Sequence, residues 1–163
     1  MTPTIRWRRR PGIVVAAALV WVPAVVLIGF NGWWPGVPDR LPAHWGGSGN
    51  TDSFDSSSSV FWQSLLPAIA CGLIAVAVIV SVGNDGSRRA SAIGYGVLAG
   101  IATATSLQWT VDVLTAVNGR ITGATNISTP FLLYLLAISW ASLTFLLAFV
   151  GSRPTSPHPQ ENA

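Results

Sequence analysis

The chain contains 163 residues, of which 50% are hydrophobic and only 9% are charged, and its formal net charge is +3. Soluble domains carry about 25% charged residues, so this composition excludes an ordinary soluble domain. The arginines flank apolar segments and form no basic face, so the positive charge does not indicate nucleic-acid binding.

Four apolar segments follow one another along the chain, at Gly12–Phe30, Val60–Val82, Ser91–Val117 and Pro130–Val150. About 20 apolar residues in a helix match the roughly 30 Å hydrocarbon core of a bilayer. The first segment exceeds the ~7–15-residue apolar region of a signal peptide, and we expect it to remain as an uncleaved anchor. The sequence therefore predicts an all-α integral membrane protein with four transmembrane helices, which are surrounded by the lipid bilayer.

These segments divide the chain into parts with different expected roles. They are a basic N-terminus (1–11), a first transmembrane hairpin (12–82) with a structured outer loop (31–59), a turn (83–90), a second hairpin (91–150) and a disordered polar tail (151–163).

The arginines are distributed unevenly about the predicted helices. Two of them, Arg40 and Arg120, fall on one side, and seven fall on the other, namely Arg6, Arg8, Arg9, Arg10, Arg88, Arg89 and Arg153. Because cytoplasmic loops retain positive charge, this asymmetry predicts that both termini are cytoplasmic and that the 31–59 loop faces outward.

Proline and tryptophan mark further features of the predicted helices. Pro23 lies inside the first segment and is expected to kink that helix, because proline has no backbone N–H. Indole rings favour the headgroup zone of a bilayer, so five tryptophans, which lie mostly near predicted helix ends, are interpreted as membrane anchors. These tryptophans are Trp33, Trp34, Trp62, Trp109 and Trp140.

Small residues recur every four positions in the third segment, at Ala92, Gly96, Gly100 and Ala104. Such a stripe lets a neighbouring helix approach closely. It is consistent either with packing inside the four-helix bundle or with a homodimer. Gly96 and Gly100 are the residues on which both interpretations depend.

The outer loop contains residues that restrict the backbone. Pro38 and Pro42 favour extended conformations in the residues that precede them, whereas the glycines of 46–49 permit a tight turn. We therefore expect a compact cap over the outer helix ends. The serine run Ser56–Ser59 is interpreted as a hydrophilic spacer.

His44 and Asp52 are candidate functional residues of this loop. A histidine N–H can donate to a carboxylate, so we expect a structural hydrogen bond between the two side chains. His44 has no second histidine or cysteine in the outer loops to complete a zinc site. The pair also lacks an evident nucleophile or oxyanion site. We therefore expect no metal, no cofactor and no catalytic residue.

The loop motif Leu41-Pro42-x-His44-Trp45 followed by Gly49-x-x-Asp52 resembles the signature of a bacterial membrane-domain family of unknown function. That domain also forms the N-terminal part of immunity proteins against the sporulation-delaying toxin. The resemblance covers Ile13–Val82 and rests on Pro38, Asp39, Arg40, Pro42, His44, Trp45, Gly49 and Asp52. It implies a bacterial plasma membrane and no established chemistry.

The chain also departs from the family pattern. Gly46 replaces an asparagine, Thr51 a proline, Asp55 a glycine and Ser57 a lysine. The third and fourth segments are only broadly similar to the helices that accompany such domains. An immunity function therefore does not transfer directly.

Asp112 lies late in the third segment, about 30 Å along the helix from its start. An acidic side chain deep in the lipid has a high free-energy cost and therefore indicates a function. An acidic side chain near the headgroups has a much lower cost. We interpret Asp112 as an interfacial acid that pairs with Arg40 or Arg120, with a proton relay as the alternative.

The sequence leads to two functional hypotheses. The first is a non-enzymatic membrane protein that recognises an extracytoplasmic peptide, lipid or membrane-protein partner. The second is a small transport or permease component, in which Asp112 and the kinked first helix line a polar path.

Overall fold

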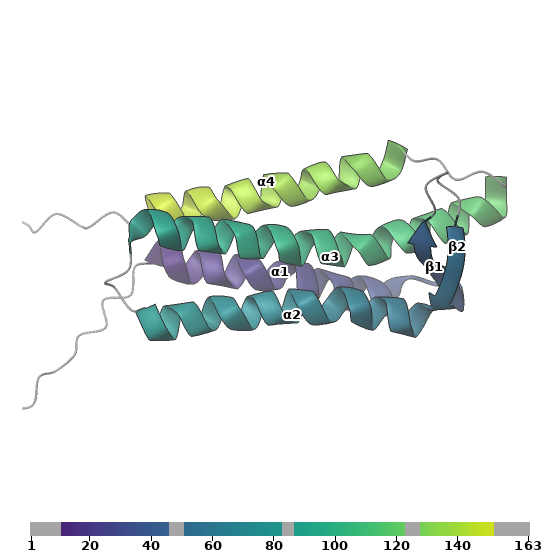
Figure 1. Ribbon diagram of the computed structural model, residues 1–163, viewed down its shortest axis with the longest axis horizontal. Coiled ribbons are helices and arrows are strands. Elements are labelled where there is room, and N and C mark those ends of the chain that lie inside the picture. Colours follow the sequence, from purple (N-terminus) through teal and green to yellow (C-terminus); the bar gives the residue numbers. More distant parts are fainter. Residues whose placement is uncertain (1–10, 46–50, 83–86, 123–127, 152–163) are drawn as a thin grey trace, which may run out of the picture.

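The computed structural model describes residues 11–45, 51–82, 87–122 and 128–151. It is mostly helical, with an elongated bundle of four helices that run alternately up and down (Figure 1). The elements are α1 (Pro11–Trp33), β1 (Arg40–Trp45), β2 (Thr51–Ser56), α2 (Ser57–Val82), α3 (Arg88–Thr122) and α4 (Ser128–Val150). Each predicted apolar segment lies inside one helix.

Three of the described helical segments are long and apolar enough to cross a membrane: Pro11–Trp33, Ser57–Val80 and Arg89–Val117. In α4, the apolar part whose side chains are described runs from Tyr134 to Val150. The helical fold is therefore compatible with a membrane protein.

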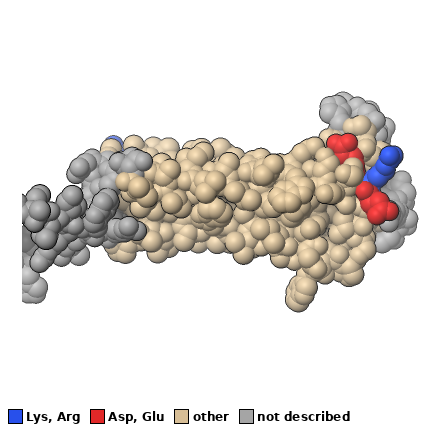
Figure 2. Space-filling model, turned by 90° about the horizontal axis from the view of Figure 1, so that it is seen from below, with Lys and Arg blue, Asp and Glu red and all other residues tan. Residues whose placement is uncertain are grey.

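The surface of the bundle is apolar along most of its length. Figure 2 shows a long region without charged side chains, and acidic and basic residues gather at the end formed by the strands. Exposed large hydrophobic side chains occur on every helix, including Val25 on α1, Leu73 on α2, Ile93 on α3 and Ile138 on α4. Soluble monomers rarely expose so large an apolar surface, whereas a hydrocarbon surrounding favours it.

Close contacts between helices depend on small residues. Helix α3 packs against each of the other three helices. A Cβ added to Gly96 would lie 3.0 Å from Cβ of Phe145 and 3.3 Å from the Ala141 carbonyl oxygen, both on α4, and one added to Gly100 would lie 3.2 Å from Cβ of Ala141. The two glycines of the predicted stripe therefore lie against α4 of the same chain.

Two further glycines lie at close contacts of α1, one with the end of α4 and one with α2. A Cβ on Gly12 would lie within 2.4 Å of Cα of Gly151, so the start of α1 and the end of α4 meet backbone to backbone. A Cβ on Gly72 of α2 would meet the indole ring of Trp21 on α1 at 2.5 Å. These contacts leave no room for larger residues, and the contact of Gly12 with Gly151 brings the two ends of the described chain together.

The connection between α1 and α2 contains regular β-structure, which the all-α prediction did not include. Strands β1 and β2 pair antiparallel, with Arg40 opposite Ser56 and Trp45 opposite Thr51. The hairpin begins after a turn in which Gly36 adopts a φ of 80°, a conformation that favours glycine after Pro35. The helices also extend further than predicted, so the segment between them is 34–56.

The serine run is part of a helix and not a spacer. The Ser56 side-chain oxygen accepts a hydrogen bond from the Ser59 backbone N–H at 3.2 Å. Serine is a favoured N-cap because it satisfies one of the free N–H groups of the first turn. Helix α2 therefore begins at Ser57, directly after β2.

Replacing Gly96 with leucine should destabilise the bundle, because the new side chain would overlap Phe145 and Ala141 on α4. Overpacking of a close contact costs about 1–3 kcal/mol. Thermal unfolding in detergent should show a lower Tm for Gly96→Leu. Gly94→Leu is the matched control on the same helix, because an added Cβ there meets nothing within 4 Å. Equal Tm values for the two variants would contradict the contact.

Candidate functional site

The β1–β2 hairpin is held against the bundle by buried residues at its base. Leu41 is 0% exposed and belongs to the main hydrophobic core, and Pro38 and Pro42 are also buried. The Ser57 backbone N–H donates to the Asp39 carbonyl at 3.0 Å. Strand β1 contacts both α2 and α3. The hairpin is therefore packed on the helices and does not extend freely from them.

The outer surface of the hairpin is charged and partly aromatic. Asp39, Arg40, Phe54 and Asp55 are exposed, and they lie at the end of the bundle that carries the charged residues in Figure 2. A rigidly attached surface of this kind can contact a partner without first becoming ordered.

The structure describes the motif residues of the predicted loop to different extents. Pro42 is buried in β1 opposite Phe54, and His44 lies opposite Ser53. The register shifts between His44 and Trp45, so that Asp52 is the additional residue in β2 next to the partner of His44. The side chains of His44, Trp45 and Asp52 and the whole of Gly49 lie outside the described part. The predicted hydrogen bond therefore stays a prediction.

A polar cluster around the buried Asp112 connects α3 and α4 near the hairpin end. Asp112 is only 2% exposed. The Gln108 side-chain amide donates to its two carboxylate oxygens at 3.0 and 3.2 Å. The Tyr134 hydroxyl of α4 donates to the Gln108 carbonyl oxygen at 2.5 Å. Asp112 thus lies in a chain of hydrogen bonds that crosses between two helices.

Gln108 is a hydrogen-bond partner of the Asp112 carboxylate that sequence analysis did not identify. The expected pairing of Asp112 with Arg40 or Arg120 stays a prediction, because the Arg120 side chain lies outside the described residues. The amide holds Asp112 in one orientation, and the tyrosine holds the amide. The sequence contains the signal for this arrangement, because Gln108 and Asp112 are four residues apart and therefore adjacent on a helix.

A second polar contact joins α1 to α4 in the apolar part of the bundle. Pro23 has no N–H to donate to the Leu19 carbonyl one turn earlier. The indole N–H of Trp140 on α4 donates to that carbonyl oxygen at 3.2 Å. The acceptor that the proline leaves free in α1 is therefore satisfied by a side chain from another helix.

The tryptophans divide into exposed and internal residues. Trp33 is 92% exposed and Trp62 is also exposed, and the anchor role of these two residues stays a prediction. Trp109 is 0% exposed and packs edge-on against Phe61, with ring centroids 6.0 Å apart. Trp140 is half-buried and bonds to Leu19. The anchor interpretation is therefore wrong for Trp109 and Trp140, which hold helices together.

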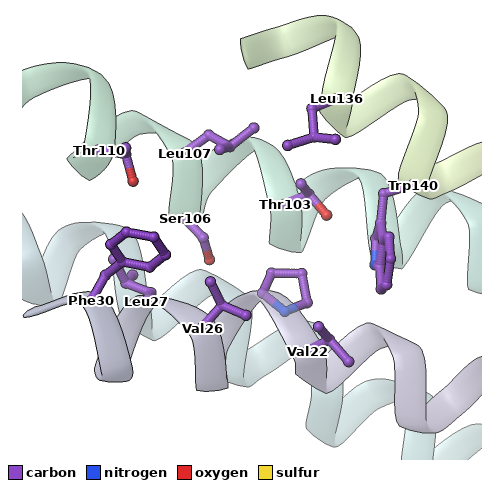
Figure 3. A pocket seen from close by; sticks show the side chains of 11 residues that line it. Val22, Val26, Leu27, Phe30, Thr103, Ser106, Leu107, Thr110, Leu136 and Trp140 are labelled. Carbon is purple, nitrogen blue, oxygen red and sulfur yellow. The ribbon is translucent and has the colours of Figure 1, made fainter. Parts of the chain in front are cut away.

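A pocket of about 370 Å³ lies next to the Trp140 contact. It is formed between α1, α3 and α4 (Figure 3). Its lining residues are Val22, Pro23, Val26, Leu27, Phe30, Thr103, Ser106, Leu107, Thr110, Leu136 and Trp140. Sequence analysis noted Pro23 as the kink of a helix along the alternative polar path, Trp140 as a membrane anchor and Thr110 as a polar neighbour of Asp112, and it predicted no pocket between these helices. The hydroxyl residues Thr103, Ser106 and Thr110 share one face of α3 by their spacing, and this was the available signal.

Comparison with known proteins gives no relative for this arrangement. No protein-family model matches the sequence, and no curated protein or solved structure matches it. Within the described ranges, no group of three or more histidine, cysteine, aspartate or glutamate residues is placed to hold a metal ion. The candidate site therefore consists of the hairpin surface, the Asp112 cluster and the interhelical pocket.

Trp140→Phe should destabilise the bundle, because it leaves the Leu19 carbonyl without the indole donor. An unsatisfied buried acceptor costs about 1–3 kcal/mol. Pro23→Ala supplies a backbone N–H for the same carbonyl, so Trp140→Phe should cost less in a Pro23→Ala background. A double-mutant cycle of thermal or denaturant unfolding measures this coupling. The exposed Trp62→Phe serves as the control, and additive effects of the Pro23 and Trp140 changes would rule out the shared carbonyl.

Proposed function

We propose that this chain is a non-enzymatic, four-span protein of a bacterial plasma membrane that recognises a partner through its hairpin surface outside the cell. The partner is a peptide or another membrane protein. The observation that carries this proposal is the hairpin itself: it is fixed to α2 and α3 by the buried Leu41 and presents Asp39, Arg40, Phe54 and Asp55 to the surroundings.

The membrane placement draws support from the apolar surface and from the charges at its two ends. Arg89 is exposed at the start of α3, whereas the charged hairpin lies at the opposite end of the bundle. By sequence, seven arginines lie at the end of the bundle that carries the two chain termini and the 83–90 loop. This favours a cytoplasmic location for that end. The resemblance of the loop motif to the bacterial membrane-domain family favours the same orientation.

Cysteine labelling in intact cells tests this topology. In a Cys71→Ala background, Ser53→Cys on the exposed hairpin should react with a membrane-impermeant maleimide added outside. Arg89→Cys at the other end should react only after the membrane is permeabilised. The reverse pattern would overturn the orientation, and reaction of both before permeabilisation would overturn the four-span placement.

Photo-crosslinking tests recognition at the hairpin. A benzophenone amino acid at the exposed Phe54 should give a defined adduct in living cells, and Arg40→Glu should reduce its yield because the positive charge at position 40 is replaced by a negative one. The same probe at Ile138, an exposed apolar position of α4, is the control for random encounters. Identical adducts at both positions, or an adduct insensitive to Arg40→Glu, would contradict recognition by the hairpin.

A second candidate function is transport, and the buried Asp112 cluster favours it. An ionisable group in a membrane bundle commonly marks an ion or proton pathway. However, the pocket between α1, α3 and α4 is lined by Thr110 and Ser106 and not by Asp112. Recognition therefore remains the first proposal.

A further inference from the structure

We propose that the pocket between α1, α3 and α4 binds a lipophilic carbonyl compound of the membrane, of the alkylated quinone class. Ser106 donates a hydrogen bond to a ring carbonyl of this ligand. The proposal rests on the membrane placement above but is independent of recognition by the hairpin. It concerns binding, with no chemical change in the ligand.

The position of the pocket determines from where a ligand can enter. On α1 it extends from Val22 to Phe30, which is about 12 Å of helix, and it ends one turn before the helix does. Val26, Phe30 and Leu136 line the pocket and are also exposed on the outer surface of the bundle. The pocket therefore opens sideways into the apolar surroundings, in the half of the bundle nearer the hairpin.

Ser106 is the polar group that makes this pocket more than an apolar groove. It is 7% exposed, and its hydroxyl has no hydrogen-bond partner among the described residues. Figure 3 shows the Ser106 oxygen directed from α3 toward α1, into the space above Val26 and Leu27. An unpaired hydroxyl in an apolar environment is unfavourable, so a ligand that supplies an acceptor here gains affinity.

Other hydroxyls in the bundle show that this arrangement is exceptional. Thr103 donates to the Ala99 carbonyl at 2.8 Å, and Thr144 donates to the Trp140 carbonyl at 2.9 Å. Both use the acceptor four residues earlier in their own helix, the usual solution in a membrane helix. Ser106, which lies between Thr103 and Thr110 on the same face, does not use this acceptor.

The lining restricts the chemistry of the ligand. No charged side chain lines the pocket, so the charge of an ionic ligand would have no opposite charge beside it. The volume of about 370 Å³ falls within the range of small-molecule sites. A plain acyl chain would fill the space but would offer no acceptor to Ser106. Ester carbonyls of bilayer lipids lie near the headgroups, whereas the ring of a neutral quinone can enter the hydrocarbon region with its carbonyls.

Binding of two matched probes to the purified protein in detergent tests this proposal. The probes are a decyl-substituted benzoquinone and decylbenzene, which has the same chain and a planar six-membered carbon ring but no carbonyl. Native mass spectrometry at increasing ligand concentration measures both affinities. We expect the quinone to bind more tightly, and Ser106→Ala to weaken quinone binding roughly 3- to 10-fold, the value of one net hydrogen bond.

Three variants complete the test. Ser106→Thr retains a hydroxyl and should retain preference for the quinone. Val26→Trp should fill the pocket and weaken binding of both probes. Ser139→Ala removes an exposed hydroxyl that bonds the Leu135 carbonyl, and it should change neither affinity. Thermal unfolding of each variant distinguishes lost binding from lost folding.

Equal affinity of the wild-type protein for the two probes would overturn the proposal, and so would quinone binding unchanged by Ser106→Ala in a folded protein. Either result would mean that hydrocarbon alone fills the pocket. Failure of the membrane placement would appear separately, as a reversed or unrestricted pattern in the cysteine-labelling experiment.

Discussion

The hydrogen bond from Trp140 to the Leu19 carbonyl connects the local effect of a proline to the arrangement of the bundle. A backbone carbonyl without a donor is costly in an apolar environment, because no water is present to replace the lost bond. Helix α1 can therefore contain Pro23 only where another group supplies a donor. The indole of α4 supplies it and fixes the separation of α1 and α4, which in turn defines one wall of the pocket.

The same constraint explains the distribution of hydroxyl groups in the helices. Thr105, Ser139 and Ser142 donate to carbonyls four residues earlier, so their polar atoms are compatible with an apolar surface. Asp112 cannot be satisfied in this way; the Gln108 amide donates to its carboxylate, and the Tyr134 hydroxyl of α4 donates in turn to the Gln108 carbonyl oxygen. Ser106 is the position where a buried hydroxyl on α3 lacks such a partner in the described chain, which is why it carries the ligand proposal.

Much of the helical architecture could be predicted from the sequence, because the length and apolarity of each segment are local properties. The boundaries of α1 and α2 differ from the prediction by a few residues: α1 continues to Trp33, and α2 begins earlier because Ser56 caps it. The small-residue stripe of α3 also indicated a close contact, although only the structure shows that Gly96 and Gly100 meet α4 of the same chain.

The β-hairpin and the pocket could not be predicted in the same way. Pairing of β1 with β2 depends on two irregular positions in the register and on burial of Leu41 against α2 and α3, which are non-local features. An interfacial role was predicted for Trp109 and Trp140 from the preference of indole rings, whereas their contacts with Phe61 and with the Leu19 carbonyl lie between helices. A residue type and a position along a helix do not determine which face of the helix is internal.

The last turns of α1 link the two proposed functional regions physically. Phe30 lines the pocket, and its carbonyl oxygen accepts a hydrogen bond from the Trp34 backbone N–H at 2.9 Å. The rings of these two residues are also near one another, with centroids 6.2 Å apart. Trp34 packs against the same core that contains Leu41 of the hairpin. The wall of the pocket and the base of the hairpin therefore belong to one continuous packed unit, so a change in the position of Phe30 would have to be accommodated by the residues that hold the hairpin.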